Sequence, residues 1–153
     1  MECRLGHSLE YFYFMIIADI LLKKYKKVLL VDDDEISNTI NKFMLEHTKF
    51  TEEVVIASSA DKALDYLNQC DENDLPEVIF LDIEMPGKTG WDFTEEIKNL
   101  SLSKNIKIVV LTSSIAKSDQ RKANEINEIT AFVSKPLSPT VLGDIQSRYL
   151  EAC

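Results

Sequence analysis

Carboxylates stand directly after two apolar runs of this 153-residue sequence. Asp32 and Asp33 follow the run VLLV, and Asp82 follows the run VIFL. If these three carboxylates converge on one crevice, they repel one another until their pKa values rise or a cation neutralises them. A cluster with only oxygen ligands suits Mg²⁺, which binds a few carboxylates, keeps waters and leaves positions for phosphate oxygens. The acidic residues therefore predict a magnesium site.

A hydroxyl and an ammonium group follow two later apolar runs. Thr112 comes after IVVL, and Lys135 comes shortly after AFV. An aspartate beside a metal ion can attack phosphorus as a nucleophile, and hydroxyl and ammonium groups can hold the transferred oxygens. With Asp82 as nucleophile and Thr112 and Lys135 as the holding groups, the set predicts phosphoryl transfer.

Five apolar runs must position these side chains, and each is followed by a segment of helical periodicity. Uninterrupted apolar strands indicate burial on both faces, as in a parallel sheet covered by helices. The predicted fold is α/β, an open sandwich of five strand-helix units. In the strand order 2-1-3-4-5, Asp33 and Asp82 would end neighbouring strands where the order reverses. The strands are predicted within 28–31, 54–56, 78–81, 108–111 and 131–133, and the first helix from the spacing of Ile36, Ile40, Phe43 and Met44.

From residue 27 to residue 150 the chain resembles the receiver domain of two-component response regulators. The matching pieces are VLLVDDDE, VIFLDIEMPGKTG, VVLTSS and FVSKP, in this order. The resemblance implies a five-stranded, flavodoxin-like (βα)5 three-layer sandwich with the order 2-1-3-4-5. It also implies a stand-alone, chemotaxis-regulator-like protein that accepts a phosphoryl group on Asp82 from a histidine kinase or histidine phosphotransfer protein. Such a protein is no conventional enzyme but catalyses its own Mg²⁺-dependent phosphorylation and dephosphorylation.

The resemblance assigns further roles around the acceptor. It implies that Asp33 and Asp82 bind Mg²⁺ directly, Asp32 largely through water, and Glu84 through its backbone carbonyl. Phosphorylation is expected to draw Thr112 toward the phosphoryl group. Two more expectations are an inward turn of Phe132 and a cis peptide between Lys135 and Pro136. Glu84 departs from the small polar residue common at its position in the family, so we expect it to alter the lifetime of the acyl phosphate.

Each of these residues also has a plainer structural interpretation. Asp34 is predicted to cap the first helix, and Thr112 or Ser113 could cap the fourth. A haloacid-dehalogenase-type phosphatase would use Asp32 as nucleophile and Asp34 as acid and base. That rival needs a further acidic motif after the lysine and leaves Asp82 unexplained. A third interpretation is a pseudo-receiver, which has the fold but is never phosphorylated.

The composition limits which partners and which cellular compartment are expected for this domain. The formal net charge of −9 argues against a nucleic-acid partner, because phosphate binding depends on Lys and Arg. Three cysteines without metal-ligand spacing suit the cytoplasm. Within the N-terminal extension, 1–26, the apolar run 9–22 is too short to span a bilayer. It remains open whether Met15 is the natural start or the segment is an accessory helix or lies on a membrane surface.

No output domain is expected after Leu150, so the predicted output is a partner protein. Because Thr112 and Lys135 lead into the fourth helix, the fifth strand and the fifth helix, the partner surface is predicted between Ala116 and Tyr149. Exposed residues of the first helix, with Asn41 as the example, are predicted to be neutral. The sequence leaves open whether the protein is a relay intermediate or a terminal regulator.

Overall fold

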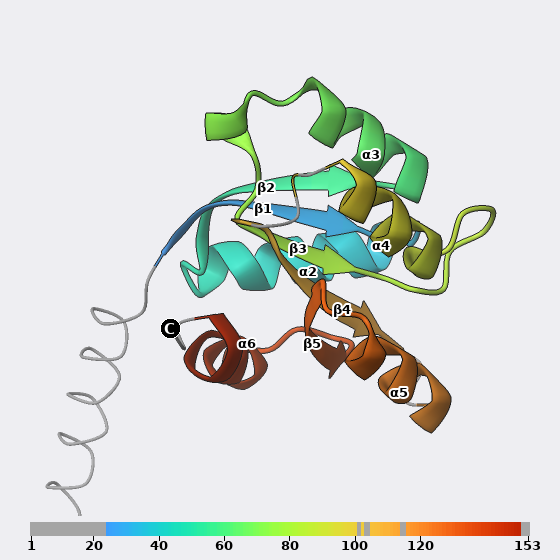
Figure 1. Ribbon diagram of the computed structural model, residues 1–153. Coiled ribbons are helices and arrows are strands. Elements are labelled where there is room, and N and C mark those ends of the chain that lie inside the picture. Colours follow the sequence, from blue (N-terminus) through green and yellow to red (C-terminus); the bar gives the residue numbers. More distant parts are fainter. Residues whose placement is uncertain (1–23, 101, 103–104, 114–115, 151–153) are drawn as a thin grey trace, which may run out of the picture.

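Five parallel strands form one sheet, and helices cover both of its faces (Figure 1). The computed structural model describes residues 24–100, 102, 105–113 and 116–150. The sheet has the order β2-β1-β3-β4-β5, so the predicted fold class and strand order are confirmed. The strands are β1 (Tyr25–Val31), β2 (Thr51–Ala57), β3 (Val78–Leu81), β4 (Lys107–Thr112) and β5 (Ile129–Ser134).

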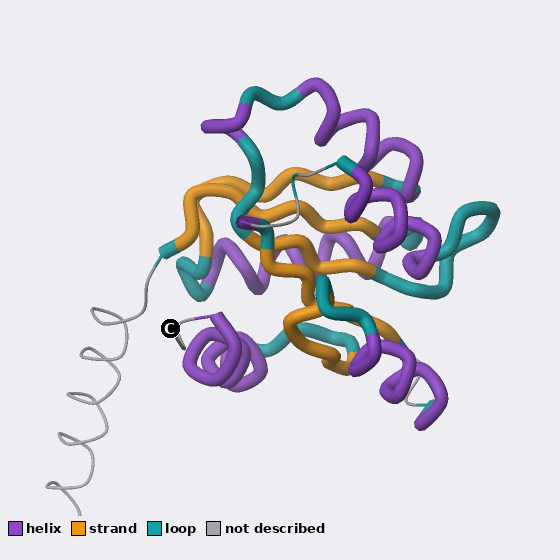
Figure 2. Tube along the Cα trace, viewed as in Figure 1, coloured by secondary structure: helices purple, strands orange, loops and turns teal. Residues whose placement is uncertain are grey.

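The helices lie in two layers, and loops at the carboxyl ends of the strands lead into them (Figure 2). Helices α2 (Glu35–His47) and α6 (Pro139–Ile145) contribute side chains to one core cluster. Helices α3 (Ala60–Gln69) and α4 (Gly90–Asn99) contribute to the other. Helix α5 (Lys117–Glu125) lies against β5, and Ala123 is its one buried residue. A short 3-10 helix, η1 (Glu72–Asp74), and a π-helix, η3 (Gln146–Leu150), complete the described elements.

The run VLLV of strand β1 is apolar without interruption because both faces of the strand are buried. Val28 and Leu30 belong to the core cluster under α2 and α6, whereas Leu29 and Val31 belong to the cluster under α3 and α4. All four side chains are at most 2% exposed. Each fully buried side chain of this size contributes roughly 1.5–3 kcal/mol to folding. Both faces of the central strands are therefore core, and polar side chains can gather only at the strand ends.

Helix α2 forms where the spacing of its apolar residues predicted. The face that it buries, however, is not the face that carries most of those apolar residues. The helix buries Asn38, Asn41 and Leu45. Of the apolar residues that predicted the helix, Met44 packs partly against the core. The other three are largely exposed: Ile36 72%, Ile40 44% and Phe43 58%.

The N-terminal boundary differs slightly from the expected one. Strand β1 begins at Tyr25, and this residue is buried and pairs with Thr51 of β2. Tyr25 and Lys26, which the sequence assigned to the extension, therefore belong to the sheet. The rest of the extension, with the apolar run 9–22, lies outside the described residues. No helix in the described part of the chain has the length and apolar character needed to cross a membrane.

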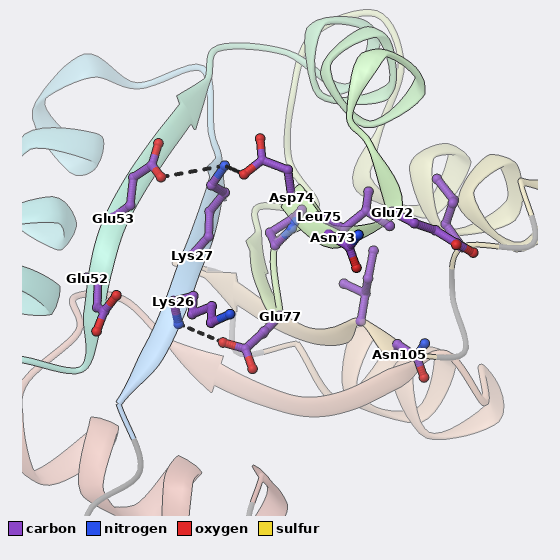
Figure 3. A pocket seen from close by; sticks show the side chains of 13 residues that line it. Lys26, Lys27, Glu52, Glu53, Glu72, Asn73, Asp74, Leu75, Glu77 and Asn105 are labelled. Atoms are coloured by element: carbon purple, nitrogen blue, oxygen red, sulfur yellow. Dashed lines mark hydrogen bonds and ion pairs between the residues drawn. The ribbon is translucent and has the colours of Figure 1, made fainter.

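A polar cavity of about 900 Å³ lies at the amino ends of the strands (Figure 3). Lys27 reaches into it from β1, with its side chain only 9% exposed. Its ammonium group donates a hydrogen bond to Asp74 at 2.6 Å and lies 3.5 Å from Glu53. The hydrogen bond to Asp74 raises the pKa of Lys27. This ion-pair cluster ties β2 and η1 to β1, far from the strand ends that carry the candidate chemistry.

Candidate functional site

The predicted acidic residues meet at the carboxyl ends of two neighbouring strands. Val31, the last residue of β1, pairs with Leu81, the last residue of β3. Asp32 and Asp82 follow these partners directly, and the Asp82 amide donates a hydrogen bond to the Val31 carbonyl. Because β1 lies between β2 and β3, this is the point where the strand order reverses and where ligands bind in such sheets.

Lys135 joins the two buried carboxylates. Asp32 is 4% and Asp82 6% exposed. The Lys135 ammonium lies 2.5 Å from Oδ2 of Asp32 and 3.0 Å from Oδ2 of Asp82. These contacts connect residues that are 103 and 53 positions apart in the sequence. The structure therefore brings together three of the residues that the sequence singled out.

Charge and burial set the protonation of this group. Burial raises the pKa of Asp82, and the nearby Asp32 carboxylate adds to the increase, although the Glu84 amide and Lys135 oppose it. Burial lowers the pKa of Lys135, but its hydrogen bonds to Asp32 and Asp82 outweigh burial and raise it. The lysine therefore stays charged, and its positive charge favours the carboxylate form of Asp82.

The donor set fits a hard cation. Asp32, Asp33 and Asp82 each offer a carboxylate oxygen, and these oxygens lie within 4.8 Å of one another. Asp33 is exposed, so it approaches the cluster from the solvent side. Glu84 also lies beside Asp82, because its amide donates a hydrogen bond to Oδ1 of Asp82 at 3.0 Å. Carboxylate oxygens at this spacing, open to water on one side, match the preference of Mg²⁺.

The loop after Asp82 is held by the start of α4. A Cβ atom on Gly90 would lie 2.6 Å from the carbonyl oxygen of Asp82, so only glycine fits this close approach. Thr89 and Asp92 form a reciprocal capping box, in which each side chain accepts a hydrogen bond from the other's backbone amide. Gly87, with φ of 77°, makes the turn between them and the acceptor. The helix terminus thereby fixes the backbone at Asp82.

Thr112 and Lys135 are linked through the β4-β5 ladder. Thr112 is completely buried and pairs with Ser134, and the Lys135 amide donates a hydrogen bond to the Thr112 carbonyl. The N-cap of α5 is Ala116, so neither Thr112 nor Ser113 is the N-cap residue of that helix. The peptide bond between Lys135 and Pro136 is cis, as the resemblance implied.

Phe132 lies on β5 and is only half-buried. It borders a cavity of about 220 Å³, together with Gln120, Ala123 and Asn124 of α5. Space therefore exists beside this ring, between β5 and the helix that follows Thr112.

Two buried asparagines support the backbone around the site, and neither role was predicted from the sequence. Asn38 donates a hydrogen bond to the Asp32 carbonyl at 2.8 Å. Asn41, predicted to be exposed and neutral, is 2% exposed, and its Oδ1 accepts a hydrogen bond from the Leu137 amide. The predicted exposure of Asn41 is wrong, because α2 turns the face with Asn38 and Asn41 inward, where their side chains bond to loop backbone. The sequence did contain one signal of these roles: Asn38 and Asn41 are three residues apart, which places both on one face of the helix.

Asp34 is the N-cap of α2, and its side chain accepts a hydrogen bond from the Ile36 amide at 3.0 Å. The predicted capping role is confirmed. The Asp34 carboxylate therefore binds the helix terminus, whereas the Asp32 carboxylate contacts Lys135.

Comparison with known proteins gives a consistent result. The family model of the response regulator receiver domain matches residues 28–145. A two-component response regulator from Cytophaga hutchinsonii has a similar crystal structure, with 31% identity, a TM-score of 0.78 and coverage of 84% of this chain and 98% of that chain. The Mn²⁺-bound response regulator Rcp1 is 28% identical, with a TM-score of 0.67 and coverage of 84% and 96%.

A curated relative is the sensor histidine kinase CheAY of Helicobacter pylori, which is 27% identical over 81% of this chain. The match spans only 15% of that longer protein. The family model, by contrast, covers most of this chain, and Asp82, the Asp32-Asp33 pair and Lys135 all stand at the strand ends described above. This chain belongs to the response regulator receiver domain family.

Proposed function

We propose that this protein accepts a phosphoryl group on Asp82 in a Mg²⁺-dependent reaction. The observation that carries the proposal is the arrangement of two buried carboxylates, Asp32 and Asp82, around the ammonium of Lys135. The donor is the phosphohistidine of a sensor histidine kinase or a histidine phosphotransfer protein, in the cytoplasm. The likeness to the Mn²⁺-bound form of the response regulator Rcp1 supports a role for a divalent ion.

The proposed reaction is an in-line displacement. A carboxylate oxygen of Asp82 attacks the phosphorus atom, an acyl phosphate bond forms, and the bond from phosphorus to the donor nitrogen breaks with its electron pair on the imidazole. Bound Mg²⁺ supplies charge neutralisation for the phosphoryl oxygens. As the resemblance implies, Asp33 and Asp82 would hold the ion directly, Asp32 would hold it through water, and Glu84 would hold it through its backbone carbonyl. Lys135 then exchanges its contact with Asp82 for a phosphoryl oxygen.

Thr112 and Phe132 are the proposed switch residues. The Thr112 hydroxyl binds the phosphoryl group, and Phe132 turns inward as Thr112 moves. The cavity beside Phe132 supports the proposal, because an aromatic ring needs free space to change its position. Helix α5, held by one buried residue, is the element that can shift at low cost.

Output is proposed to pass to another protein through the surface of α5, β5 and α6, between Ala116 and Tyr149. Both residues that contact the phosphoryl group lead into this surface. The Lys135 amide is bonded to the Thr112 carbonyl, so movement of one strand end is shared with the other. The same protein can regulate a target or return its phosphoryl group to a histidine.

The phosphatase alternative is less favourable, because Asp34 would have to be its acid and base. Its carboxylate accepts the hydrogen bond from the Ile36 amide that caps α2, so it serves the helix terminus. Asp82, which that mechanism does not use, lies instead at the centre of the cluster.

Incubation with acetyl phosphate and Mg²⁺, followed by mass spectrometry of intact protein and of peptides, tests the proposal. We expect one base-labile phosphate on Asp82, dependent on Mg²⁺, and none in Asp82→Asn. Asp65→Asn, at an exposed position of α3, is the matched control and should be phosphorylated normally. Phosphate on Asp32, or no phosphate on the wild-type protein, would refute the assignment.

A further inference from the structure

Helix α5, the element that the proposed switch must move, is held weakly. Of its nine residues only Ala123 is buried. Its N-cap, Ala116, has no side-chain oxygen that could accept a hydrogen bond from the first turn. A short helix with so little buried surface opens locally at small cost. A single side-chain contact between α5 and a neighbouring element can therefore change how freely this helix moves.

One such contact joins α5 to the start of α4. The ammonium group of Lys122 on α5 lies 4.7 Å from the centre of the Trp91 ring on α4. A cation at this distance over an indole face is attracted by the negative potential of the ring. Both side chains line a cavity of about 220 Å³ between the two helices. The contact therefore joins α4 and α5 where other side chains leave space open.

The Asp92 carboxylate strengthens the hold on Lys122. Asp92 follows Trp91 and is part of the capping box at the start of α4. Hydrogen bonds from Thr89 lower the pKa of Asp92, and the positive charge of Lys122 adds to this lowering. Lys122 is thus attracted both by an aromatic ring and by a carboxylate that the helix terminus keeps in place. The three side chains, Trp91, Asp92 and Lys122, form the α4-α5 clasp.

The α4 end of the clasp is attached to the candidate site. Gly90 immediately precedes Trp91, and its amide donates a hydrogen bond to the Ile83 carbonyl at 3.2 Å. Gly90 also packs against the carbonyl oxygen of Asp82, so closely that a Cβ atom would not fit. The clasp therefore connects α5 to the backbone beside Asp82, along a route separate from the β4-β5 ladder.

We infer that the α4-α5 clasp holds α5 in its unphosphorylated arrangement and opens when the helix shifts. The opening step rests on the proposed function, because it follows phosphorylation of Asp82. Opening costs one exposed cation–π contact, which is weak enough for new contacts to the phosphoryl group to offset. The holding role needs no phosphorylation, so loss of the clasp should make α5 more mobile in the resting protein.

Amide hydrogen exchange of the unphosphorylated full chain tests the holding role. Lys122→Gln removes the charge and keeps a good helix former, so α5 amides should exchange roughly two- to fivefold faster than in the wild-type protein. Trp91→Leu, which removes the ring, should have the same effect. The double variant should exchange about as fast as either single variant, because both remove one shared contact.

Arg121→Gln is the matched control, since it removes the same charge from the preceding exposed position of α5. It should leave the exchange of α5 unchanged. Additive effects of Lys122→Gln and Trp91→Leu, or wild-type exchange in Lys122→Gln, would overturn the inference.

Acrylamide quenching of fluorescence tests the opening step, because Trp91 is the only tryptophan of the chain. Lys122→Gln uncovers the ring and should raise the quenching constant. Phosphorylation of the wild-type protein by acetyl phosphate and Mg²⁺ should raise it toward the same value, relative to Mg²⁺ alone. Asp82→Asn treated in the same way should not change.

Mass spectrometry of the same samples separates the two claims. Phosphate on Asp82 with unchanged quenching of Trp91 would refute the clasp and leave the proposed function standing. No phosphate on Asp82 would refute the proposed function and with it the opening step.

Discussion

Asp33 differs from its two neighbours in the cluster by being exposed. It makes no described contact with Lys135, whereas Asp32 and Asp82 both do. Its main interaction is therefore expected to be with the cation. Asp33→Ala should lower Mg²⁺ affinity by at least about tenfold, as measured by titration calorimetry. Asp65→Ala is the control. Equal affinities of Asp33→Ala and the wild-type protein would remove Asp33 from the site.

Asp82 is expected to be destabilising in the metal-free protein. Burial and the Asp32 carboxylate raise its pKa, which means that the fold disfavours its ionised form. In Asp82→Asn the side-chain oxygen can still accept the Glu84 amide hydrogen bond, and Lys135 keeps Asp32. Thermal melts without Mg²⁺ should therefore give Asp82→Asn a midpoint at or above that of the wild-type protein. A clearly lower midpoint would show that Asp82 holds the structure together.

At the scale of elements, the capping box at the start of α4 is the feature to test. Thr89→Ala should lower the free energy of unfolding by about 1 kcal/mol, because it removes an N-cap. Denaturant melts measure this change. Hydrogen bonds from Thr89 lower the pKa of Asp92. A carboxyl with a lowered folded pKa stabilises the fold above its unfolded pKa of about 3.9, and this contribution is lost as the pH falls through the folded value.

The stability difference between wild-type protein and Asp92→Asn should therefore be constant from pH 7 to about pH 5 and should shrink below about pH 4. A difference that stays the same at low pH would mean that the Asp92 charge is not part of the cap.

The strand ends were predictable from the sequence, because burial on both faces of a strand permits only apolar residues between its ends. The run VIFL and the following Asp82 are an example, and all four side chains of the run are at most 1% exposed. It was also predictable that Lys135 would lie near carboxylates, because the carboxyl ends of neighbouring parallel strands meet at one edge of the sheet. The distances were not, because they depend on strand register, which side-chain type does not encode.

Helix α2 shows where the sequence pattern misleads. Its apolar spacing fitted a buried stripe at Ile36, Ile40 and Phe43, yet the structure buries the face with Asn38 and Asn41. These amides satisfy the backbone of Asp32 and Leu137, a demand that arises only after the loops are in place. Periodicity alone counts apolar residues and cannot detect such partners. Glu46, exposed on the same helix, is the appropriate neutral position in place of Asn41.

At the scale of the whole molecule, the sheet places the proposed acceptor at the end of one strand and the proposed output surface on the strands beyond it. Asp82 follows β3, Thr112 ends β4, and Phe132 lies on β5. A phosphoryl group can shift the population of two arrangements only if it contacts them differently. Thr112 and Lys135 are the contacts that could do so, and both continue into the surface between Ala116 and Tyr149.

Amide hydrogen exchange before and after phosphorylation by acetyl phosphate and Mg²⁺ tests this account most directly. The wild-type protein should change its exchange between Ala116 and Tyr149, Asp82→Asn should not change, and α2 near Glu46 should stay constant. Phe132→Ala should still be phosphorylated on Asp82 but should lose much of the change. Exchange that alters around α2 while residues between Ala116 and Tyr149 remain as before, or that alters equally in Asp82→Asn, would contradict it.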